Sequence, residues 1–346
     1  MIEEKTEKTG PLLHISTSPH IFHKGGIPSI MLSVVMALVP AFIGSIFFFG
    51  FRSLLLTCTC VIAAVGAEWL AASLAKKPTT VHDFSAVVTG MLLAFSLPPG
   101  LPLWMAFLGG VFAATVAKTA FGGLGNNFIN PALAGRCFLM ISFPTAMTTW
   151  SAPLQGTIHG LTKGLDGISA ATPLAYFKSA LASGNFHPLD FQEALPRLFL
   201  GNVGGCTGET SALLLLAGAF FLGYKRIIGF GIPLFFIGTV FLLFWVFNGT
   251  GGFMTSEAFI VPFYQILSGG LLLGALFMAV DPVTTPITPW GRVVFGAGCG
   301  VLTFTFRVFG NTGEGVCYAI LLMNCCTPLI EQWTRPRRYG EVKKSE

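Results

Sequence analysis

The amino-acid sequence predicts an all-α integral membrane protein with about ten transmembrane helices. Of its 346 residues, 53% are hydrophobic and only 10% are charged, whereas soluble domains carry about 25% charged residues. Apolar stretches such as Ile27–Phe49 and Ile228–Phe247 reach the roughly 20 residues that span the core of a bilayer. Lysine and arginine recur between alternate stretches, as they do on the cytoplasmic side of membranes. These observations exclude a soluble globular protein.

The predicted spans follow one another along most of the chain. In order, they are Ile27–Phe49, Ser53–Ala75, Ser85–Leu97, Leu101–Ala117, Ala132–Trp150, Ser211–Gly223, Ile228–Phe247, Ala258–Val280, Val293–Phe309 and Val316–Ile330. An even number of spans puts both termini on one side, and the positive-inside rule makes that side the cytoplasm. The basic residues that this topology places there are Lys76, Lys77, Lys118, Lys225, Arg226 and, in the tail, Arg335, Arg337, Arg338, Lys343 and Lys344.

The spans divide the chain into five regions. We expect a cytoplasmic segment at 1–26, a first transmembrane half at 27–150, an external segment at 151–210, a second transmembrane half at 211–330 and a basic cytoplasmic tail at 331–346. The first span is too long for the apolar region of a signal peptide, so we expect it to remain as an anchor.

Two of the predicted helices are too short to cross a bilayer completely. Ser85–Leu97 and Ser211–Gly223 have 13 residues each, which gives roughly 20 Å of helix against a core of about 30 Å. Short helices in two oppositely oriented halves indicate an inverted repeat with a binding site near the membrane midplane. We therefore expect a five-plus-five inverted repeat with short or broken helices, although these two segments do not occupy equivalent positions in it.

Charge and cysteine content exclude other kinds of site. The net charge of +5 is concentrated in the C-terminal tail, where a topogenic role explains it without nucleic-acid binding. The eight cysteines form no C-x-x-C pair and no cluster with histidine at zinc or iron–sulfur spacing, so we expect no metal site.

Ionisable side chains near or inside the spans require an explanation, because burying a charge in a membrane is costly. Glu68, Glu209 and Asp281 are the candidates for an ion pathway. The alternative is that they are paired structural charges.

A glycine-rich stretch, Gly201–Gly208, leads into the short helix at Ser211. Its backbone amides could hold a phosphate or another anion, which makes Gly204, Gly205 and Thr207 candidate cofactor contacts. Packing hinges are the alternative role for these glycines.

The external segment contains the sequence Asp166-Gly-Ile-Ser169-Ala-Ala-Thr172-Pro-Leu. Small residues around a threonine, followed by proline, predict an accessible hydroxyl on a short exposed turn. The stretch is similar to the D-x-x-[ST]-G-A-T flavinylation signature of the D subunit of the Rnf-type ion-translocating electron-transport complex, and of its relative, the B subunit of the sodium-pumping NADH:quinone oxidoreductase. The resemblance implies FMN joined to Thr172 by a phosphoester, with Asp166 and Ser169 in the attachment motif. Ala170 stands where the pattern often has glycine.

The resemblance covers nearly the whole chain. It includes Ser18-Pro-His, Asn130-Pro-Ala-Leu-Ala-Gly-Arg136, Gly201-Asn-Val-Gly-Gly-Cys-Thr-Gly-Glu-Thr-Ser211, Met278-Ala-Val-Asp-Pro-Val-Thr284 and Tyr318-Ala-Ile-Leu-Leu-Met-Asn324. The short segment before Ile27 favours the D subunit over the quinone-reductase subunit, which usually carries a longer one.

This resemblance implies a flavin-carrying subunit of a redox-driven ion pump in the bacterial inner membrane. Such a complex couples electron transfer between ferredoxin and NAD to the movement of Na⁺ or H⁺. The implied partners are other membrane and peripheral subunits, and a flavin transferase that attaches FMN. We expect no catalytic residue in the isolated chain, and a second, noncovalent flavin is left open. The alternative function is an autonomous channel or secondary transporter without a redox role.

Overall fold

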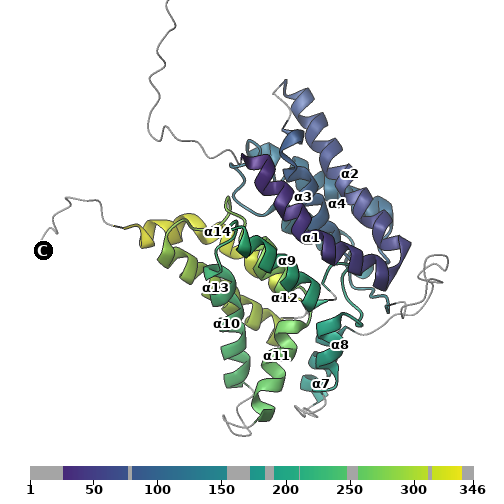
Figure 1. Ribbon diagram of the computed structural model, residues 1–346, viewed down its shortest axis with the longest axis vertical. Helices are drawn as coiled ribbons and strands as arrows, with labels where there is room; N and C mark the ends of the chain where they lie inside the picture. Colours follow the sequence, from purple (N-terminus) through teal and green to yellow (C-terminus); the bar gives the residue numbers. More distant parts are fainter. Residues whose placement is uncertain are drawn as a thin grey trace, which may run out of the picture.

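In the described part of this protein, whose structure is a computed structural model, helices make up the regular structure. The structure describes residues 26–76, 80–153, 172–183, 191–209, 211–247, 256–310 and 314–336. Asp166 and Ser169 lie outside these residues, as does most of the predicted cytoplasmic segment 1–26. The described helices form two neighbouring groups, one from each half of the chain (Figure 1).

The first group contains the helices before the predicted external segment. They are α1 (Ile27–Phe49), α2 (Phe51–Leu74), η1 (Val81–Asp83), α3 (Ser85–Phe95), α4 (Leu103–Thr115), η2 (Thr119–Phe121), α5 (Pro131–Ser142) and α6 (Pro144–Met147). Two further helices, α7 (Pro173–Ser183) and α8 (Ala194–Leu200), follow at one end of the molecule and pack against the second group.

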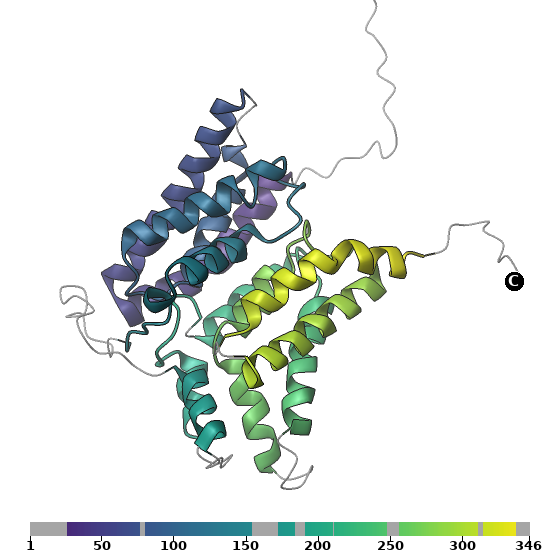
Figure 2. The same cartoon turned by 180° about the vertical axis from the view of Figure 1, so that it is seen from behind.

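The second group begins with a short helix and contains a bent one. Its members are α9 (Ala212–Tyr224), α10 (Gly231–Phe247), η6 (Ser256–Phe259), α11 (Ile260–Leu267), α12 (Leu271–Leu273), η7 (Gly274–Met278), α13 (Pro289–Val308) and α14 (Val316–Thr334). Seen from behind, α13 and α14 run side by side (Figure 2), and these two helices are in contact.

The lengths and surfaces of the helices identify a membrane protein. Three described helical stretches, Ile27–Phe49, Phe51–Leu74 and Leu103–Phe121, are long and apolar enough to cross a membrane, and the bent pair Ile260–Leu267 and Leu271–Met278 makes a fourth if it counts as one span. Large apolar side chains such as Phe220, which is 74% exposed, point outward. Water would oppose such a surface, whereas lipid accommodates it. The prediction of a helical membrane protein is confirmed.

Each of the ten predicted segments overlaps one helix or several consecutive helices, and α3 and α9 are short as expected. The segment Ala258–Val280 differs from a simple span, because its helix axis bends by 68° at Ser268–Gly270. Gly269 adopts φ +65° there, and a Cβ atom at this residue would lie 2.6 Å from Leu174. The backbone therefore breaks at a residue whose conformation and surroundings both require glycine.

Packing in the second group repeats packing in the first. Helix α2 contacts α3 and α4, and α10 contacts α11 and α13 in the same way; α4 contacts α5 as α13 contacts α14. Between the groups, α1 meets α9 and α5 meets α14. The bent α11–η7 is thus the counterpart of α3, and α9 is the counterpart of α1. The two short helices that the sequence singled out, α3 and α9, are not counterparts.

Candidate functional site

Thr172 caps the amino end of α7. Its Oγ1 accepts a hydrogen bond from the backbone N–H of Ala175 at 3.2 Å, which is the role that threonine commonly has before a helix. The hydroxyl of Tyr264 on α11 donates to the carbonyl oxygen of Pro173 at 2.7 Å. Thr172 is only 8% exposed, which contradicts the expectation that its hydroxyl is accessible: capping and packing draw this residue inward. The rest of the predicted turn before Thr172 lies outside the described residues.

A small cavity brings Thr172 together with residues that are distant in sequence. The cavity measures about 10 Å³, and its wall includes Thr172, Gly204, Gly205, Glu209, Gly269 and Glu314. Two of the predicted glycine contacts and one predicted ion-pathway residue therefore lie around the same space as the predicted flavin attachment residue.

Thr207, by contrast, does not line this cavity. Its side chain is fully buried, and its Oγ1 lies 2.6 Å from the carbonyl oxygens of Ala94 and Leu97. The backbone N–H of Gly208 donates to the carbonyl oxygen of Phe95 at 3.0 Å. These contacts satisfy carbonyl groups at the end of α3, which have no partner within their own helix. Thr207 therefore joins the two halves of the chain.

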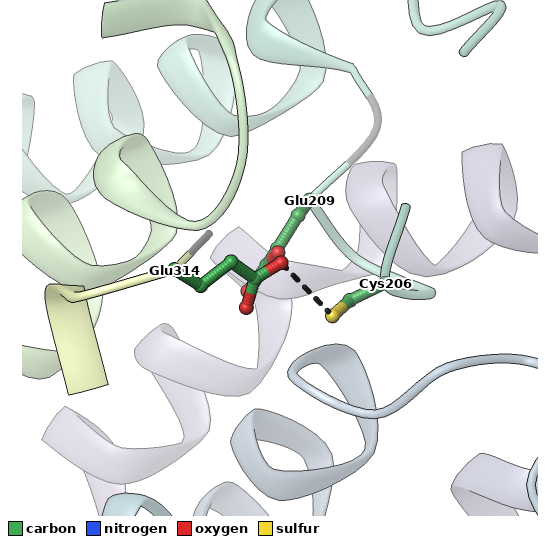
Figure 3. A group of neighbouring side chains, drawn as sticks. All are labelled: Cys206, Glu209 and Glu314. Carbon is green, nitrogen blue, oxygen red and sulfur yellow. Dashed lines mark hydrogen bonds between the residues drawn. The ribbon is translucent and has the colours of Figure 1, made fainter. Parts of the chain in front are cut away.

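Behind the cavity, Arg136 of α5 pairs with two carboxylates. Its Nη1 donates to Glu209 Oε1 at 2.9 Å, and its Nη2 donates to Glu314 Oε2 and to Cys206 Sγ. The two carboxyl groups face each other, and the Cys206 thiol points toward Glu314 (Figure 3). Glu209 is 6% exposed and Arg136 is 5% exposed. We call Arg136, Cys206, Glu209 and Glu314 the Arg136 cluster.

The Arg136 cluster brings together three groups that commonly bind metals. Ligand atoms of Cys206, Glu209 and Glu314 all lie within 4.8 Å of one another. The sequence did not reveal this group, because Glu314 is far from the other two along the chain. The Arg136 guanidinium contacts all three side chains, so the group is an ion-paired cluster with a cation already present.

Glu68 belongs to a second buried pair. Its Oε2 accepts a hydrogen bond from Lys118 Nζ at 2.6 Å, and the same ammonium donates to Ser85 Oγ at 2.7 Å. Lys118 is only 2% exposed. Buried charges of this kind are normally paired, which matches the structural alternative for Glu68. Lys118 is consequently not a solvated positive charge. It therefore does not count as evidence, under the positive-inside rule, that its loop lies in the cytoplasm.

Asp281 lies at a larger cavity between the two groups of helices. The cavity measures about 240 Å³, and its wall combines polar residues with apolar ones from α1 and α9. The polar members are Ser85, Thr89, Lys118, Asn127, Asn130 and Asp281. The three predicted ion-pathway residues are thus divided: Asp281 lines this cavity, Glu68 is bonded to its wall through Lys118, and Glu209 lies at the smaller one.

A family model matches residues 14–340, and its description is the NQR2, RnfD, RnfE family. This chain belongs to that family. It is 42% identical to the D subunit of the proton-translocating ferredoxin:NAD(+) oxidoreductase complex of Clostridium ljungdahlii, over 98% of this chain and 99% of that protein. It is 43% identical to the D subunit of the Na(+)-translocating complex of Acetobacterium woodii, over 96% of each chain. It is 37% identical to the D subunit of the ion-translocating oxidoreductase complex of Escherichia coli, over 96% of this chain and 99% of that protein.

Family membership confirms the resemblance that the motifs indicated. Two relatives of nearly equal identity are named for different ions, H⁺ and Na⁺. Overall sequence identity to these relatives therefore does not indicate which of the two ions this chain would serve.

Proposed function

We propose that this chain is the flavin-carrying membrane subunit of a redox-driven ion pump. In this role it passes electrons through FMN joined to Thr172, while its complex couples ferredoxin and NAD chemistry to the translocation of Na⁺ or H⁺. The observation that carries the proposal is the position of Thr172. The residue expected from the flavinylation signature shares one cavity wall with Gly204, Gly205 and Glu209, in a chain similar along almost its full length to the D subunits of such complexes.

The cavity beside Thr172 is too small to enclose a flavin. A cavity of about 10 Å³ is far below the roughly 300–1,000 Å³ of pockets that enclose a ligand of drug size. Next to it is a more open hollow of about 430 Å³, whose wall includes Arg197 and Asn202 and shares Val203 and Gly204 with the small cavity. At Gly205, the space where a side chain would begin is open. Thr172 would hold the phosphate at the edge of this hollow, outside the small cavity, and the hollow would accept the ring.

FMN would supply the electron-transfer chemistry, and the protein supplies position and electrostatics. Because Gly204 and Gly205 have no side chains, their backbone could approach the phosphate closely. Arg197 would add a positive charge beside the ring. Arg136 keeps the carboxylates of Glu209 and Glu314 in fixed positions behind the attachment residue.

A second, noncovalent flavin would fit the cavity between the helix groups. Its volume of about 240 Å³ is slightly below that of pockets for whole drug-sized ligands, about 300 Å³ or more. The cavity would therefore hold the ring system and leave the chain of the flavin outside. Asn127 would accept a hydrogen bond from the polar edge of the ring, because its Oδ1 has no hydrogen-bond partner among the described residues. The apolar residues would contact the faces of the ring.

We propose a bacterial inner-membrane protein with ten membrane segments in a five-plus-five inverted repeat. The repeated packing of α2–α5 and α10–α14 supports this arrangement. Both termini would lie in the cytoplasm, and Thr172 would lie on the external side. The domain boundaries predicted from the sequence remain predictions.

The proposed partners are the other membrane and peripheral subunits of the complex, together with a flavin transferase. The names of the relatives support the first group, because each relative is called a subunit of a complex.

The test is covalent flavin on the denatured protein. The chain is co-expressed with an active flavin transferase, denatured and separated on a gel, and the band is examined for flavin fluorescence. We expect a fluorescent wild type, a dark Thr172→Ala variant and a fluorescent Ser179→Ala variant. Ser179 is the matched control, because it is an exposed hydroxyl on the same helix.

A dark wild-type band, or a fluorescent Thr172→Ala band, would contradict the proposal. A dark wild-type band would favour the alternative of an autonomous channel or transporter, for which the bent α11–η7 would be the starting point. A fluorescent Thr172→Ala band would place the flavin on another residue.

A further inference from the structure

One carboxylate oxygen of the Arg136 cluster lacks a hydrogen bond within the described part of the chain. Glu209 Oε1 accepts from Arg136, but Oε2 is buried and has no hydrogen-bond partner among the described residues. Leaving a buried acceptor unsatisfied costs about 1–3 kcal/mol, and more if it is charged. An unsatisfied buried group therefore indicates an ion, a proton or a water molecule that completes the site.

The charges around this oxygen favour a positive species. Glu209 and Glu314 carry two negative charges, and Arg136 supplies one positive charge, so the cluster alone has a net charge of −1. Arg307 of α13 is a second cation nearby. Its guanidinium donates to Gln265 and to the carbonyl oxygen of Ser268, and it forms no ion pair with Glu209 or Glu314, so its charge acts on the cluster from a longer distance. The thiols of Cys206 and Cys317 are the other titratable groups facing Arg136.

The space beside Glu209 has room for one small particle. The cavity of about 10 Å³ corresponds to a single water-sized particle, for which about 10–15 Å³ is the minimum. Its wall contains Glu209, Glu314 and Gly269 at the bend of α11–α12. A Cβ atom at Gly270 would come within 2.3 Å of Glu209 Oε1, so the carboxylate lies directly against the bend. Breaks in membrane helices are common places for cations to bind.

We propose that this cavity binds one monovalent cation, with Glu209 Oε2 as its principal ligand. The cation is Na⁺ in the cavity or a proton on the carboxylate. Glu314 contributes negative charge, and Arg136 limits the occupancy to a single charge. Because Thr172 is in the same cavity wall, negative charge added to a flavin there would strengthen cation binding through Coulomb attraction. This last link rests on the proposed function, whereas the cation site does not.

The first experiment measures the response of thermal unfolding to Na⁺. Purified full-length chain in detergent is titrated with NaCl that replaces choline chloride at constant ionic strength. A ligand that binds only the folded state raises the midpoint of unfolding as its concentration passes its dissociation constant. For a sodium site, we expect a saturable rise in the wild type and an apparent affinity at least about tenfold weaker, equivalent to 1.4 kcal/mol, in Glu209→Gln.

Glu331→Gln is the matched control. Glu331 accepts a hydrogen bond from the backbone N–H of Ile287, away from the Arg136 cluster, and its removal should leave the Na⁺ response unchanged. If Glu209→Gln fails to fold, Glu314→Gln replaces it, because it removes the same amount of charge from the cluster.

The second experiment detects the proton. Infrared spectra of the same samples without Na⁺ are searched for the carbonyl stretch of a protonated carboxylic acid that Glu209→Gln lacks and Glu331→Gln retains. A Na⁺ response that depends on Glu209 establishes a sodium site. A Glu209-dependent acid band without a Na⁺ response establishes a proton site. Absence of both overturns the proposal.

Wild-type chain made without the flavin transferase separates this site from the proposed function. It should keep Glu209-dependent cation binding and lose any strengthening of that binding on reduction. If the wild type carries no covalent flavin but binds the cation through Glu209, the site stands and the flavin proposal falls. If the wild type is flavinylated but binds no cation, the flavin proposal stands and the site falls.

Discussion

Arg136 holds together residues that lie 73 and 178 positions away in the sequence, namely Glu209 and Glu314. Both contacts are largely sequestered from solvent. Replacing both members of a buried ion pair with apolar residues often changes the free energy of unfolding little. Removing only one member is costly, because it leaves an uncompensated buried charge. The importance of Arg136 therefore lies in the two carboxylates that it neutralises.

We predict that Arg136→Met lowers the free energy of unfolding by about 3–5 kcal/mol, the usual result when one member of a buried pair is removed. Arg136→Lys should lose less, because it keeps the charge but not the two-pronged geometry. The measurement is thermal or denaturant unfolding in detergent. Arg292→Met is the control: this arginine is exposed, and its loss should change stability by less than about 1 kcal/mol. Equal effects of Arg136→Met and Arg292→Met would contradict the assigned role.

Individual site residues were predictable to the extent that local motifs determine them. Thr172, Gly204, Gly205 and Glu209 were selected from sequence, and they meet at one cavity. Thr207 was selected with them, but its hydroxyl lies against the carbonyl oxygens of Ala94 and Leu97 instead of at the cavity. The grouping of Cys206 and Glu209 with Glu314 depends on tertiary contacts, which no local pattern contains.

At the scale of elements, the contact between α1 and α9 depends on a glycine. A Cβ atom at Gly218 would lie 2.1 Å from the carbonyl oxygen of Ala37, a separation that side chains do not tolerate. The two helices can therefore approach this closely only because residue 218 has no side chain, as is common between membrane helices.

We predict that Gly218→Val separates α1 from α9 and destabilises the protein by about 1–3 kcal/mol or more, the usual cost of overpacking. The readouts are the unfolding midpoint and the fraction of monodisperse protein on size exclusion in detergent. Gly238→Ala on α10 is the control, since a Cβ atom there meets nothing within 4 Å. Alanine should be neutral or stabilising by up to about 1 kcal/mol at that position. Similar losses from both substitutions would show that the α1–α9 contact is not the cause.

Helix positions were predictable because each apolar segment is long and bounded by charged or turn-forming residues. The bend at Ser268–Gly270 was missed, since the apolar residues on both sides make the segment read as one continuous span. Two adjacent glycines are the local signal, but glycine is common in straight membrane helices as well. The positive φ of Gly269 comes from the packing of Leu174 and the two helix ends.

At the scale of the whole molecule, orientation in the membrane follows from charge. Lys76, Lys225 and Arg226 are all at the ends of helices and, by the positive-inside rule, should remain in the cytoplasm. We predict that green fluorescent protein fused after residue 346 fluoresces, and that alkaline phosphatase fused within the predicted external segment 151–210 is active. Phosphatase fused after residue 346 should be inactive. The reverse pattern of activities would invert the topology and place Thr172 inside the cell.

Membrane residence was predictable because it depends on composition, which needs no tertiary contacts. The correspondence between α3 and the bent α11–η7 was not predictable from the sequence, because it is defined by the contacts that each helix makes. Neither cavity could be anticipated from sequence either, because each is enclosed by segments that are distant from one another along the chain.

The burial of Thr172 has a consequence for how such a chain matures. If Thr172 carries FMN as proposed, attachment would have to occur during a limited interval before α7 docks, because a buried hydroxyl that caps a packed helix is out of reach of a modifying enzyme once folding is complete. The same enclosure would afterwards protect the phosphoester from hydrolases. A cell short of flavin during synthesis would thus accumulate permanently unmodified subunits, and restoring the vitamin later would benefit only newly made chains.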